Sequence, residues 1–229
     1  MSNLKLMENS HFYISEESKD VHYQYIKREI FDLLIYDMPF CQLPSRGLVL
    51  DVGANIGMFA HFAITRKNSK VICFEPAQNC LPALRKNLDF IEFYLNKPIV
   101  IEKGAWSNSG TLSFFEHSEF SGCNRIVKDG DNPEGGEVFK IEVVSIDDTV
   151  KDLDLNRVDF IKMDVEGAEL EALKGASDTI KKFKPKMAIS AYHKPQDEVE
   201  LVDYIKSIAD YKITIVNHTY IGIKIAYCY

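Results

Sequence analysis

The chain has 229 residues, of which 46% are hydrophobic and 27% are charged, and its formal net charge is −7. This length predicts one large domain, and the composition excludes disordered and fibrous proteins. A negative net charge argues against a protein that binds nucleic acid through many phosphate contacts.

The cysteines and the apolar segments indicate in which cellular compartment the protein is expected. The five cysteines are scattered, and no two stand at the two-residue spacing of zinc and redox motifs. This pattern favours reduced, mostly buried thiols. No window reaches the ~18 uncharged apolar residues of a membrane span, and the N-terminus lacks the apolar core and cleavage site of a secretion signal. We therefore expect a soluble cytoplasmic protein without a membrane partner.

The hydrophobic pattern predicts alternating strands and helices. Apolar residues at helical spacing indicate an amphipathic helix from Asp20 to about Met38, which Pro39 and Pro44 end. Short apolar runs then alternate with amphipathic stretches. The strands are expected at 48–50, 71–74, 99–101, 160–163 and 187–190, with helices marked by Phe59 to Ala63, Leu81 to Ile91, Leu170 to Ala176 and Val199 to Ala209. Such an order indicates a parallel sheet covered on both faces, the α/β doubly wound class.

The rhythm changes between about Trp106 and Thr149. Segments 111–115 and 138–143 alternate as strands do, and the polar, glycine-rich stretch from Asp129 to Gly136 separates them. We expect extra strands and a mobile loop here, inserted after the third strand of the sheet.

The C-terminal end of the chain predicts a hairpin. Residues 213–216 and 221–227 read as two strands joined by a polar turn, with no helix between them. The sheet must therefore carry one antiparallel strand near its edge. We expect residues 47–229 to form the core domain and residues 1–46 to pack on it as a helical extension.

A glycine-bearing turn follows the first predicted strand. In an open parallel sheet, ligands bind at the carboxyl ends of the strands. There the chain places Asp51–Gly57, a turn that leads into a helix N-terminus. The dinucleotide fingerprint requires a second glycine where Asn55 stands. S-adenosylmethionine is the alternative ligand, and Asp51 is placed to face its cationic sulfonium and amino groups. An ordinary strand-to-helix turn is the other interpretation of this segment.

Glu75 and Pro76 follow the second predicted strand, about 20 residues beyond the turn. A carboxylate at this point accepts hydrogen bonds from both ribose hydroxyls of a bound nucleoside. The two features together favour a nucleoside ligand, and Asn55 favours S-adenosylmethionine over NAD.

Asp164 and His193 each follow a later parallel strand, so we expect both to face the same crevice. A carboxylate beside an imidazole forms a usable general base pair. The competing interpretations are a helix cap for Asp164 and a capping or packing role for His193. Asp164, Glu166 and His193 are also donors for Mg²⁺, but the sequence contains no tight ligand cluster, and a metal is not favoured.

These motifs identify the chain as similar to the FkbM family of S-adenosylmethionine-dependent methyltransferases. The resemblance rests on Asp51–Gly57, on Phe74–Pro76 and on Ile161–Glu169, in that order. Lesser support comes from Gly104–Ser107, Ser145–Asp148 and Tyr192–His193. The resemblance covers roughly residues 47–200, and the combination of the three motifs is more specific than any one of them.

The resemblance implies a Rossmann-like class I methyltransferase fold, with a seven-stranded, mostly parallel sheet whose last strand is antiparallel. It also implies O-methylation of hydroxyl groups on sugars, glycans or polyketide-type natural products. By this resemblance, the methionine end of the cofactor would be held by Asp51, Gly53, Ala54, Asn55 and Gly57, and Asp164 would contact its amino group. The ribose would be held by Glu75 and Pro76, and the adenine by Trp106 and Ser107. Trp106 departs from the smaller residue expected there, and either adenine stacking or core packing would explain it.

We expect base-assisted, in-line methyl transfer. In this hypothesis His193 takes the acceptor's proton while Asp164 orients the imidazole. Substrate choice is expected to lie in the segment from Phe114 to Gly136, together with the first helix, and the Asp- and Gly-rich end of this segment is expected to form a lid. Within it, Asn124 and Arg125 are candidates for hydrogen bonds to a sugar or its phosphate, and a solvated loop is the competing interpretation. The alternatives are a non-catalytic nucleoside-binding module and a methyltransferase that acts on nucleic acid or protein.

Overall fold

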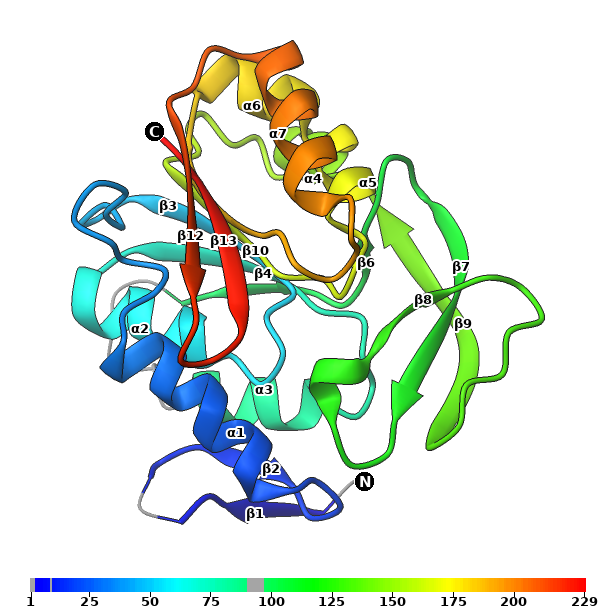
Figure 1. Cartoon of the computed structure of the whole chain (residues 1–229). Helices are drawn as coiled ribbons and strands as arrows, with labels where there is room; N and C mark the ends of the chain where they lie inside the picture. Colours follow the sequence, from blue (N-terminus) through cyan, green and yellow to red (C-terminus); the bar gives the residue numbers. More distant parts are fainter. Residues whose placement is uncertain (1–2, 9, 90–96) are drawn as a thin grey trace.

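The computed structural model describes residues 3–8, 10–89 and 97–229. Its centre is a seven-stranded sheet in the order β12-β13-β11-β10-β3-β4-β5 (Figure 1). The strands are β3 (Leu48–Val52), β4 (Lys70–Phe74), β5 (Ile99–Ile101), β10 (Phe160–Met163), β11 (Lys186–Ser190), β12 (Ile213–His218) and β13 (Ile223–Cys228).

The strand directions confirm the predicted fold class. Strands β5, β4, β3, β10 and β11 are parallel neighbours, whereas β13 runs antiparallel to both β11 and β12. From β3 the chain moves outward to β4 and β5, and from β10 it moves the other way to β11. The order therefore reverses between β3 and β10, where Val52 is the register partner of Met163. This reversal is the switch point at which such sheets bind ligands.

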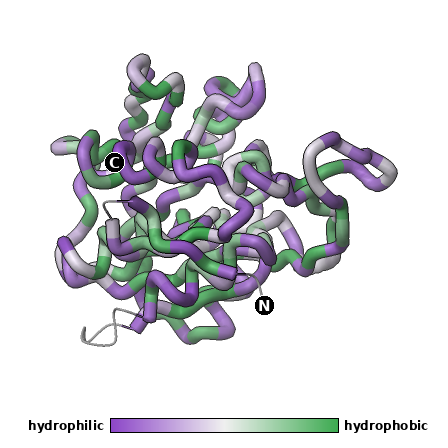
Figure 2. Tube along the Cα trace, turned by 90° about the horizontal axis from the view of Figure 1, so that it is seen from below, coloured by the Kyte–Doolittle hydropathy of each residue, from purple (hydrophilic) through white to green (hydrophobic). Residues whose placement is uncertain are grey.

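Helices cover both faces of the sheet. They are α2 (Met58–Lys67), α3 (Leu81–Asp89), α4 (Ile146–Asp152), α5 (Glu169–Lys174), α6 (Ser177–Phe183) and α7 (Asp197–Ile208). Val49 belongs to the apolar cluster shared with α2 and α3, whereas the next residue, Leu50, belongs to the cluster shared with α5 to α7. Successive strand residues thus face opposite layers, as in any strand buried on both sides. Figure 2 shows hydrophobic and hydrophilic residues interspersed along the trace of the whole chain.

The N-terminal segment differs from the single helix predicted for it. Helix α1 (Asp20–Lys27) continues as a short π-helix, η1 (Arg28–Asp32), and the helical part ends well before Met38. Leu34 has a φ of 51°, a left-handed conformation that a helix cannot continue through. A small hairpin of β1 (Leu4–Leu6) and β2 (Tyr13–Ser15) precedes the helix. Its strands are too short to be recognised from periodicity. The division of the chain at residue 46 stays a prediction.

The segment between β5 and α4 contains a second, four-stranded sheet in the order β6-β9-β7-β8. Its strands are β6 (Gly104–Ala105), β7 (Gly110–His117), β8 (Arg125–Val127) and β9 (Gly136–Val144). Strands β7 and β9 correspond to the two predicted strands, and β6 and β8 were not predicted. A short 3₁₀ turn, η3 (Ser121–Cys123), lies between β7 and β8. The sheet stands to one side of the helical layers (Figure 1).

Two further expectations concern the end of one helix and membrane-spanning helices. The helix expected from Leu81 to Ile91 corresponds to α3, which is described as far as Asp89. Ile91 lies outside the described residues. Among the helices of the described residues, none is both long enough and apolar enough to cross a bilayer.

Candidate functional site

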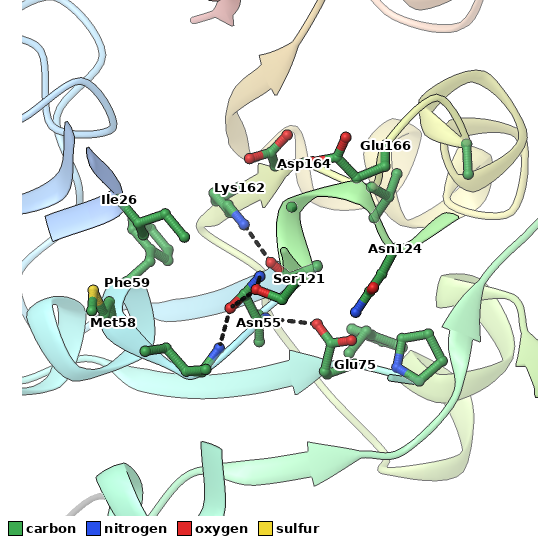
Figure 3. A pocket seen from close by; sticks show the side chains of 18 of the residues that line it. Ile26, Asn55, Met58, Phe59, Glu75, Ser121, Asn124, Lys162, Asp164 and Glu166 are labelled. Atoms are coloured by element: carbon green, nitrogen blue, oxygen red, sulfur yellow. Dashed lines mark hydrogen bonds between the residues drawn. The ribbon is translucent and has the colours of Figure 1, made fainter. Parts of the chain in front are cut away.

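A cavity of about 260 Å³ lies at the carboxyl ends of β3, β4 and β10 (Figure 3). The loops after these strands form its floor. Residues of α1 and η1 close one side, and residues of η3 and β7 close another. The cavity thus occupies the switch point of the sheet, where the sequence predicted a ligand.

The turn after β3 depends on glycine at a close backbone approach. Gly53 has a φ of 81°, and a Cβ at this position would lie 1.8 Å from the carbonyl oxygen of Asp164. The loops after β3 and β10 therefore pack backbone against backbone. Gly53, Ala54 and Asn55 line the cavity. Gly57 does not, because its Cα faces α3, where a Cβ would lie 2.7 Å from Leu84 Cδ1.

Asp51 lies below the cavity rather than on its wall. Its side chain is fully buried, and its Oδ1 lies 3.4 Å from Nζ of Lys162. Lys162 Nζ also donates a hydrogen bond of 2.6 Å to the carbonyl oxygen of Gly53. Burial alone would lower the pKa of Lys162, but the Asp51 and Asp164 carboxylates raise it above its ordinary value. Asp51 was expected to face a cationic cofactor. The structure places a protein cation beside it instead.

Glu75 lies at the end of β4, buried in the cavity wall next to Pro76. Its Oε2 accepts a 2.6 Å hydrogen bond from the Asn55 amide, and its Oε1 accepts a 2.9 Å bond from the Ala77 amide. Burial raises the pKa of Glu75 to about 7, although the hydrogen bonds from the two amides favour the ionised form and act to lower the pKa. Each carboxylate oxygen retains a lone pair for a further donor.

Trp106 and Ser107 are not among the residues that line the cavity. Trp106 packs against a small apolar cluster that includes Phe114 and Val143. Its carbonyl oxygen is also closely approached by Gly175. These contacts favour the core-packing interpretation of this tryptophan. Ala105, one residue earlier, does line the cavity.

The structure separates the two candidate substrate residues. Asn124 is buried on the cavity wall, where its side chain donates to Asn79 Oδ1 at 2.9 Å and accepts from the His117 amide at 2.9 Å. Arg125 lies outside the cavity, donates to the Cys123 carbonyl at 3.0 Å, and covers the Phe115 ring. Residues 129–136, expected to form a lid, do not contribute to the cavity wall.

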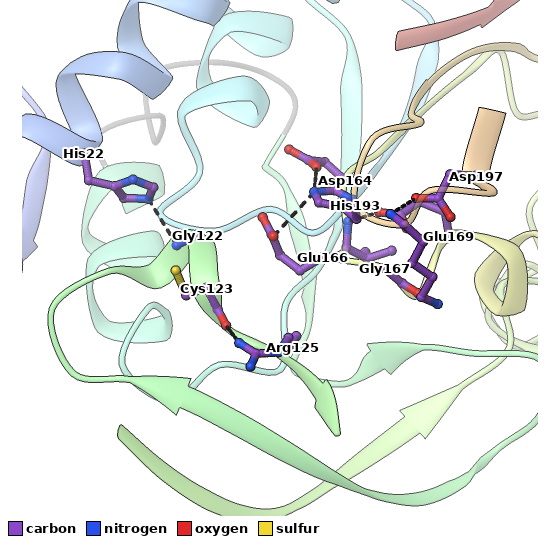
Figure 4. A network of polar contacts seen from close by, with 12 residues as sticks. His22, Gly122, Cys123, Arg125, Asp164, Glu166, Gly167, Glu169, His193 and Asp197 are labelled. Carbon is purple, nitrogen blue, oxygen red and sulfur yellow. Dashed lines mark hydrogen bonds and ion pairs between the residues drawn. The ribbon is translucent and has the colours of Figure 1, made fainter. Parts of the chain in front are cut away.

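Three carboxylates surround His193 (Figure 4). Its Nδ1 lies 2.8 Å from Glu169 Oε1, and its Nε2 lies 3.5 Å from Asp164 Oδ1 and 3.4 Å from Glu166 Oε2. Burial by itself lowers the pKa of His193, but Glu169 and then the other two carboxylates raise it to about 9. Burial, together with Asp164, raises the pKa of Glu166 to about 8.

The fold brings together the three residues that the sequence offered only as separate donors for Mg²⁺. One ligand atom from each of Asp164, Glu166 and His193 lies within 4.8 Å of the others. Asp164 and Glu166 line the cavity, and His193 stands behind them. A metal was not favoured because the sequence contains no tight ligand cluster, whereas the folded chain does contain one.

The first helix was expected to take part in substrate choice, but the sequence did not indicate which of its residues reach the site. Glu29, on η1, and Tyr36 both line the cavity, and the Tyr36 hydroxyl donates to Asp164 Oδ2 at 3.3 Å. Burial, followed by the effect of Asp164, raises the pKa of Glu29 to about 7. Tyr192, beside His193, also lines the cavity. A glutamate next to Ile30 on the apolar face of a predicted helix was the available signal for Glu29.

Comparison with known proteins gives a consistent result. Residues 51–213 match the family model described as the methyltransferase FkbM domain. Over 183 residues the chain is 32% identical to methyltransferase sdnD of Sordaria araneosa, covering 68% of this chain and 69% of that protein. Over 132 residues it is 32% identical to hexuronic acid methyltransferase AglP of Haloferax volcanii, covering 57% of this chain and 50% of that protein.

A solved structure extends the comparison beyond the matched segment. The methyltransferase FkbM from Methylobacillus flagellatus is 27% identical and has a TM-score of 0.63, covering 94% of this chain and 55% of that chain. The present chain thus spans about half the length of that protein and of AglP. The family match, the relative at 32% identity and the shared fold agree. The chain belongs to the FkbM family of S-adenosylmethionine-dependent methyltransferases.

Proposed function

We propose that this protein transfers the methyl group of S-adenosylmethionine to a hydroxyl oxygen of a sugar, glycan or related small molecule. The observation that carries the proposal is a cavity at the switch point of the sheet whose wall joins Asn55, Glu75 and Asp164. We assign one of these carboxylates, Glu75, to the ribose of the cofactor and another, Asp164, to the reacting group.

The cofactor half of the proposal rests on charge and on hydrogen-bonding capacity. The cavity wall carries the acidic groups of Glu29, Glu75, Asp164 and Glu166, and its lysine, Lys162, is already engaged by Asp51 and the Gly53 carbonyl. Such a wall favours a cationic sulfonium over the pyrophosphate of NAD. We assign the ribose hydroxyls to Glu75 and the methionine end to the backbone of residues 53–55.

The acceptor half rests on the chemistry of the far wall. Methyl transfer breaks the bond between carbon and sulfur as the bond between carbon and the acceptor oxygen forms, and the hydroxyl must lose its proton. We assign assistance in this step to Asp164, on the cavity wall, with His193 behind it. AglP, which is named for a hexuronic acid, supports a sugar acceptor. A sugar offers oxygen nucleophiles.

Two measurements test the proposal. Isothermal titration should show binding of S-adenosylmethionine, and none of NAD. Transfer of a labelled methyl group should then occur to at least one member of a panel of neutral and acidic sugars, glycans and hydroxylated polyketides. Tight binding without transfer to any class of acceptor, including protein and RNA, would identify a non-catalytic nucleoside-binding module instead.

Cofactor affinity should rise with pH through the titration of Glu75. Its pKa is raised to about 7, so the carboxyl is mostly protonated at pH 6 and mostly ionised at pH 8. Ribose hydroxyls donate to the ionised form, so binding is linked to proton release. We expect affinity for S-adenosylmethionine to increase by up to about tenfold between pH 6 and pH 8. Calorimetry at pH 6 and pH 8 should show that affinity changes less with pH in Glu75→Gln than in the wild type. An equal change of affinity with pH in the two proteins would contradict the assignment of the ribose to Glu75.

Removing His193 should lower turnover rather than cofactor affinity, because the imidazole does not line the cavity. We expect kcat of His193→Ala to fall by about 100-fold, the lower end of what proton-transfer groups contribute. The dissociation constant of S-adenosylmethionine should change little. His218→Ala is the matched control, because His218 lies on edge strand β12 against Tyr227. A His193→Ala enzyme with unchanged cofactor affinity and full turnover would remove His193 from the reaction.

A further inference from the structure

Asp164, Glu166 and His193 present three potential metal ligands to one another at the edge of the cavity (Figure 4). The three residues come from the loop after β10 and the loop after β11, which are parallel neighbours in the sheet. Their carboxylate oxygens and imidazole nitrogen lie within 4.8 Å of one another. Two of these side chains are also part of the cavity wall, so a group bound here would face the acceptor.

The imidazole is the second, independent sign of a ligand. The His193 side chain is only 8% exposed, yet its Nε2 has no hydrogen-bond partner and points toward Asp164 and Glu166. Asp164 Oδ1, on the other side of the gap, is likewise buried without a hydrogen bond. Buried polar atoms normally form hydrogen bonds, so two such atoms that face each other at 3.5 Å without one point to an occupant between them.

The other side of the ring is held in the way that metal-binding histidines are held. Nδ1 lies 2.8 Å from Oε1 of Glu169, whose side chain is 1% exposed. The same Glu169 oxygen accepts a 3.0 Å hydrogen bond from the Val165 amide, which fixes the carboxylate. A carboxylate behind one ring nitrogen orients the ring toward the cluster, so that the other nitrogen can bind a cation in exchange for its proton.

The cluster also carries more acidic groups than basic ones, which favours a bound cation. Asp164, Glu166 and Glu169 bring three acidic groups to one imidazole, and like charges at this range repel. Lys162 is committed to Asp51 and to the Gly53 carbonyl, and Lys194 is committed to the Gly167 carbonyl. Neither ammonium therefore occupies the gap.

We propose that Asp164, Glu166 and His193 bind one hard divalent cation, Mg²⁺ or Mn²⁺, at the wall of the cavity. Two carboxylate oxygens and one imidazole suit such an ion, which keeps its remaining positions for water or for a hydroxyl of the acceptor. Metal binding does not depend on the proposed function. Its role does, since the cation acts on the acceptor oxygen.

The role follows from the balance of the reaction. Coordination would lower the pKa of the acceptor hydroxyl, so that Asp164 and His193 assist the loss of its proton by holding the cation, and the proton leaves to water. The resulting oxygen attacks the methyl carbon, the bond between carbon and sulfur breaks, and the electron pair of that bond neutralises the sulfonium. The products are a methyl ether and a thioether, and no other reactant is needed.

The site can be tested with Mn²⁺ alone, without cofactor or acceptor. The full chain is treated with EDTA, dialysed, and titrated with Mn²⁺ by calorimetry and by electron paramagnetic resonance. We expect one site per chain. Electron spin-echo modulation should show a nitrogen nucleus coupled to the bound Mn²⁺, and this coupling should disappear in His193→Ala.

The variants identify the ligands. Glu166→Gln, at a half-buried position that can accept the amide, should weaken Mn²⁺ binding at least tenfold, as should Asp164→Asn. Glu169→Gln should weaken it by about 10–100-fold through the orientation of the ring. Glu198→Gln, on α7 and paired with Lys224, is the matched control and should bind Mn²⁺ as the wild type does. Circular dichroism confirms that each variant is folded.

Two results would overturn the proposal. One is the absence of a stoichiometric Mn²⁺ site in the folded wild type, and the other is a site whose affinity is the same in Glu166→Gln and Glu198→Gln. These results are distinct from failure of the proposed function. Methyl transfer that persists in excess EDTA, in a protein without a Mn²⁺ site, removes the metal and keeps the methyltransferase reaction. Mn²⁺ binding without methyl transfer to any hydroxyl keeps the metal site and removes the proposed methyltransferase reaction.

Discussion

Gly53→Ala is expected to lose about 3–5 kcal/mol of unfolding free energy, because two costs add at this position. The left-handed backbone, with a φ of 81°, disfavours any side chain. The new Cβ would also lie 1.8 Å from the Asp164 carbonyl oxygen, so the loops after β3 and β10 would have to separate. Urea denaturation monitored by circular dichroism measures the loss.

Gly130→Ala separates the two costs. Gly130 has a φ of 94°, and a Cβ there would meet no atom within 4 Å. This variant should lose only the conformational part, about 1–2 kcal/mol. Equal losses in the two variants would mean that the close approach between the two loops contributes nothing to stability.

Lys162→Met is expected to cost about 3–5 kcal/mol, because it leaves the Asp51 carboxylate buried without a partner. The pair is almost entirely inaccessible, with exposed fractions of 7% for the Lys162 side chain and 0% for that of Asp51. The variant also removes the 2.6 Å hydrogen bond to the Gly53 carbonyl, which is part of the cavity wall. Chemical denaturation gives the difference in unfolding free energy.

A double variant and a surface control sharpen this test. Asp51→Leu combined with Lys162→Met should recover most of the stability, because an apolar pair replaces a buried ion pair at little net cost. Lys174→Met removes an exposed ion pair with Glu171 and should change stability by at most about 1 kcal/mol. A Lys162→Met variant as stable as Lys174→Met would show that Asp51 needs no partner in the folded chain.

Local patterns predicted most of the sheet. The strands that contain Leu50, Phe74, Ile161 and Ile189 were recognised because uninterrupted apolar runs of this length are characteristic of strands buried on both faces. The C-terminal hairpin was recognised because no helix separates its two strands. The N-terminal helix was predicted too long, since the periodicity continues past Leu34 while the backbone does not.

Sequence patterns also predicted the candidate site only in part. Asp51, Glu75 and Asp164 all follow predicted strands, so the rule of carboxyl ends selects them equally, although Asp51 lies within β3 in the structure. The structure separates them. Glu75 and Asp164 line the cavity, and Asp51 lies beneath it next to Lys162. Lys162 stands within an apolar strand, and its charge was the one sequence signal that this strand also carries a buried ion pair.

The sequence by itself determined the fold class, the family motifs and the edge of the sheet at which chemistry takes place. These depend on hydrophobic period and on strand order, which are properties of neighbouring residues. Only the tertiary structure decided which acidic groups pair, which line the cavity, and that His193 meets Asp164 and Glu166. Those contacts join residues that are distant in the chain, and they depend on the register of β3, β10 and β11 and on the close approach at Gly53.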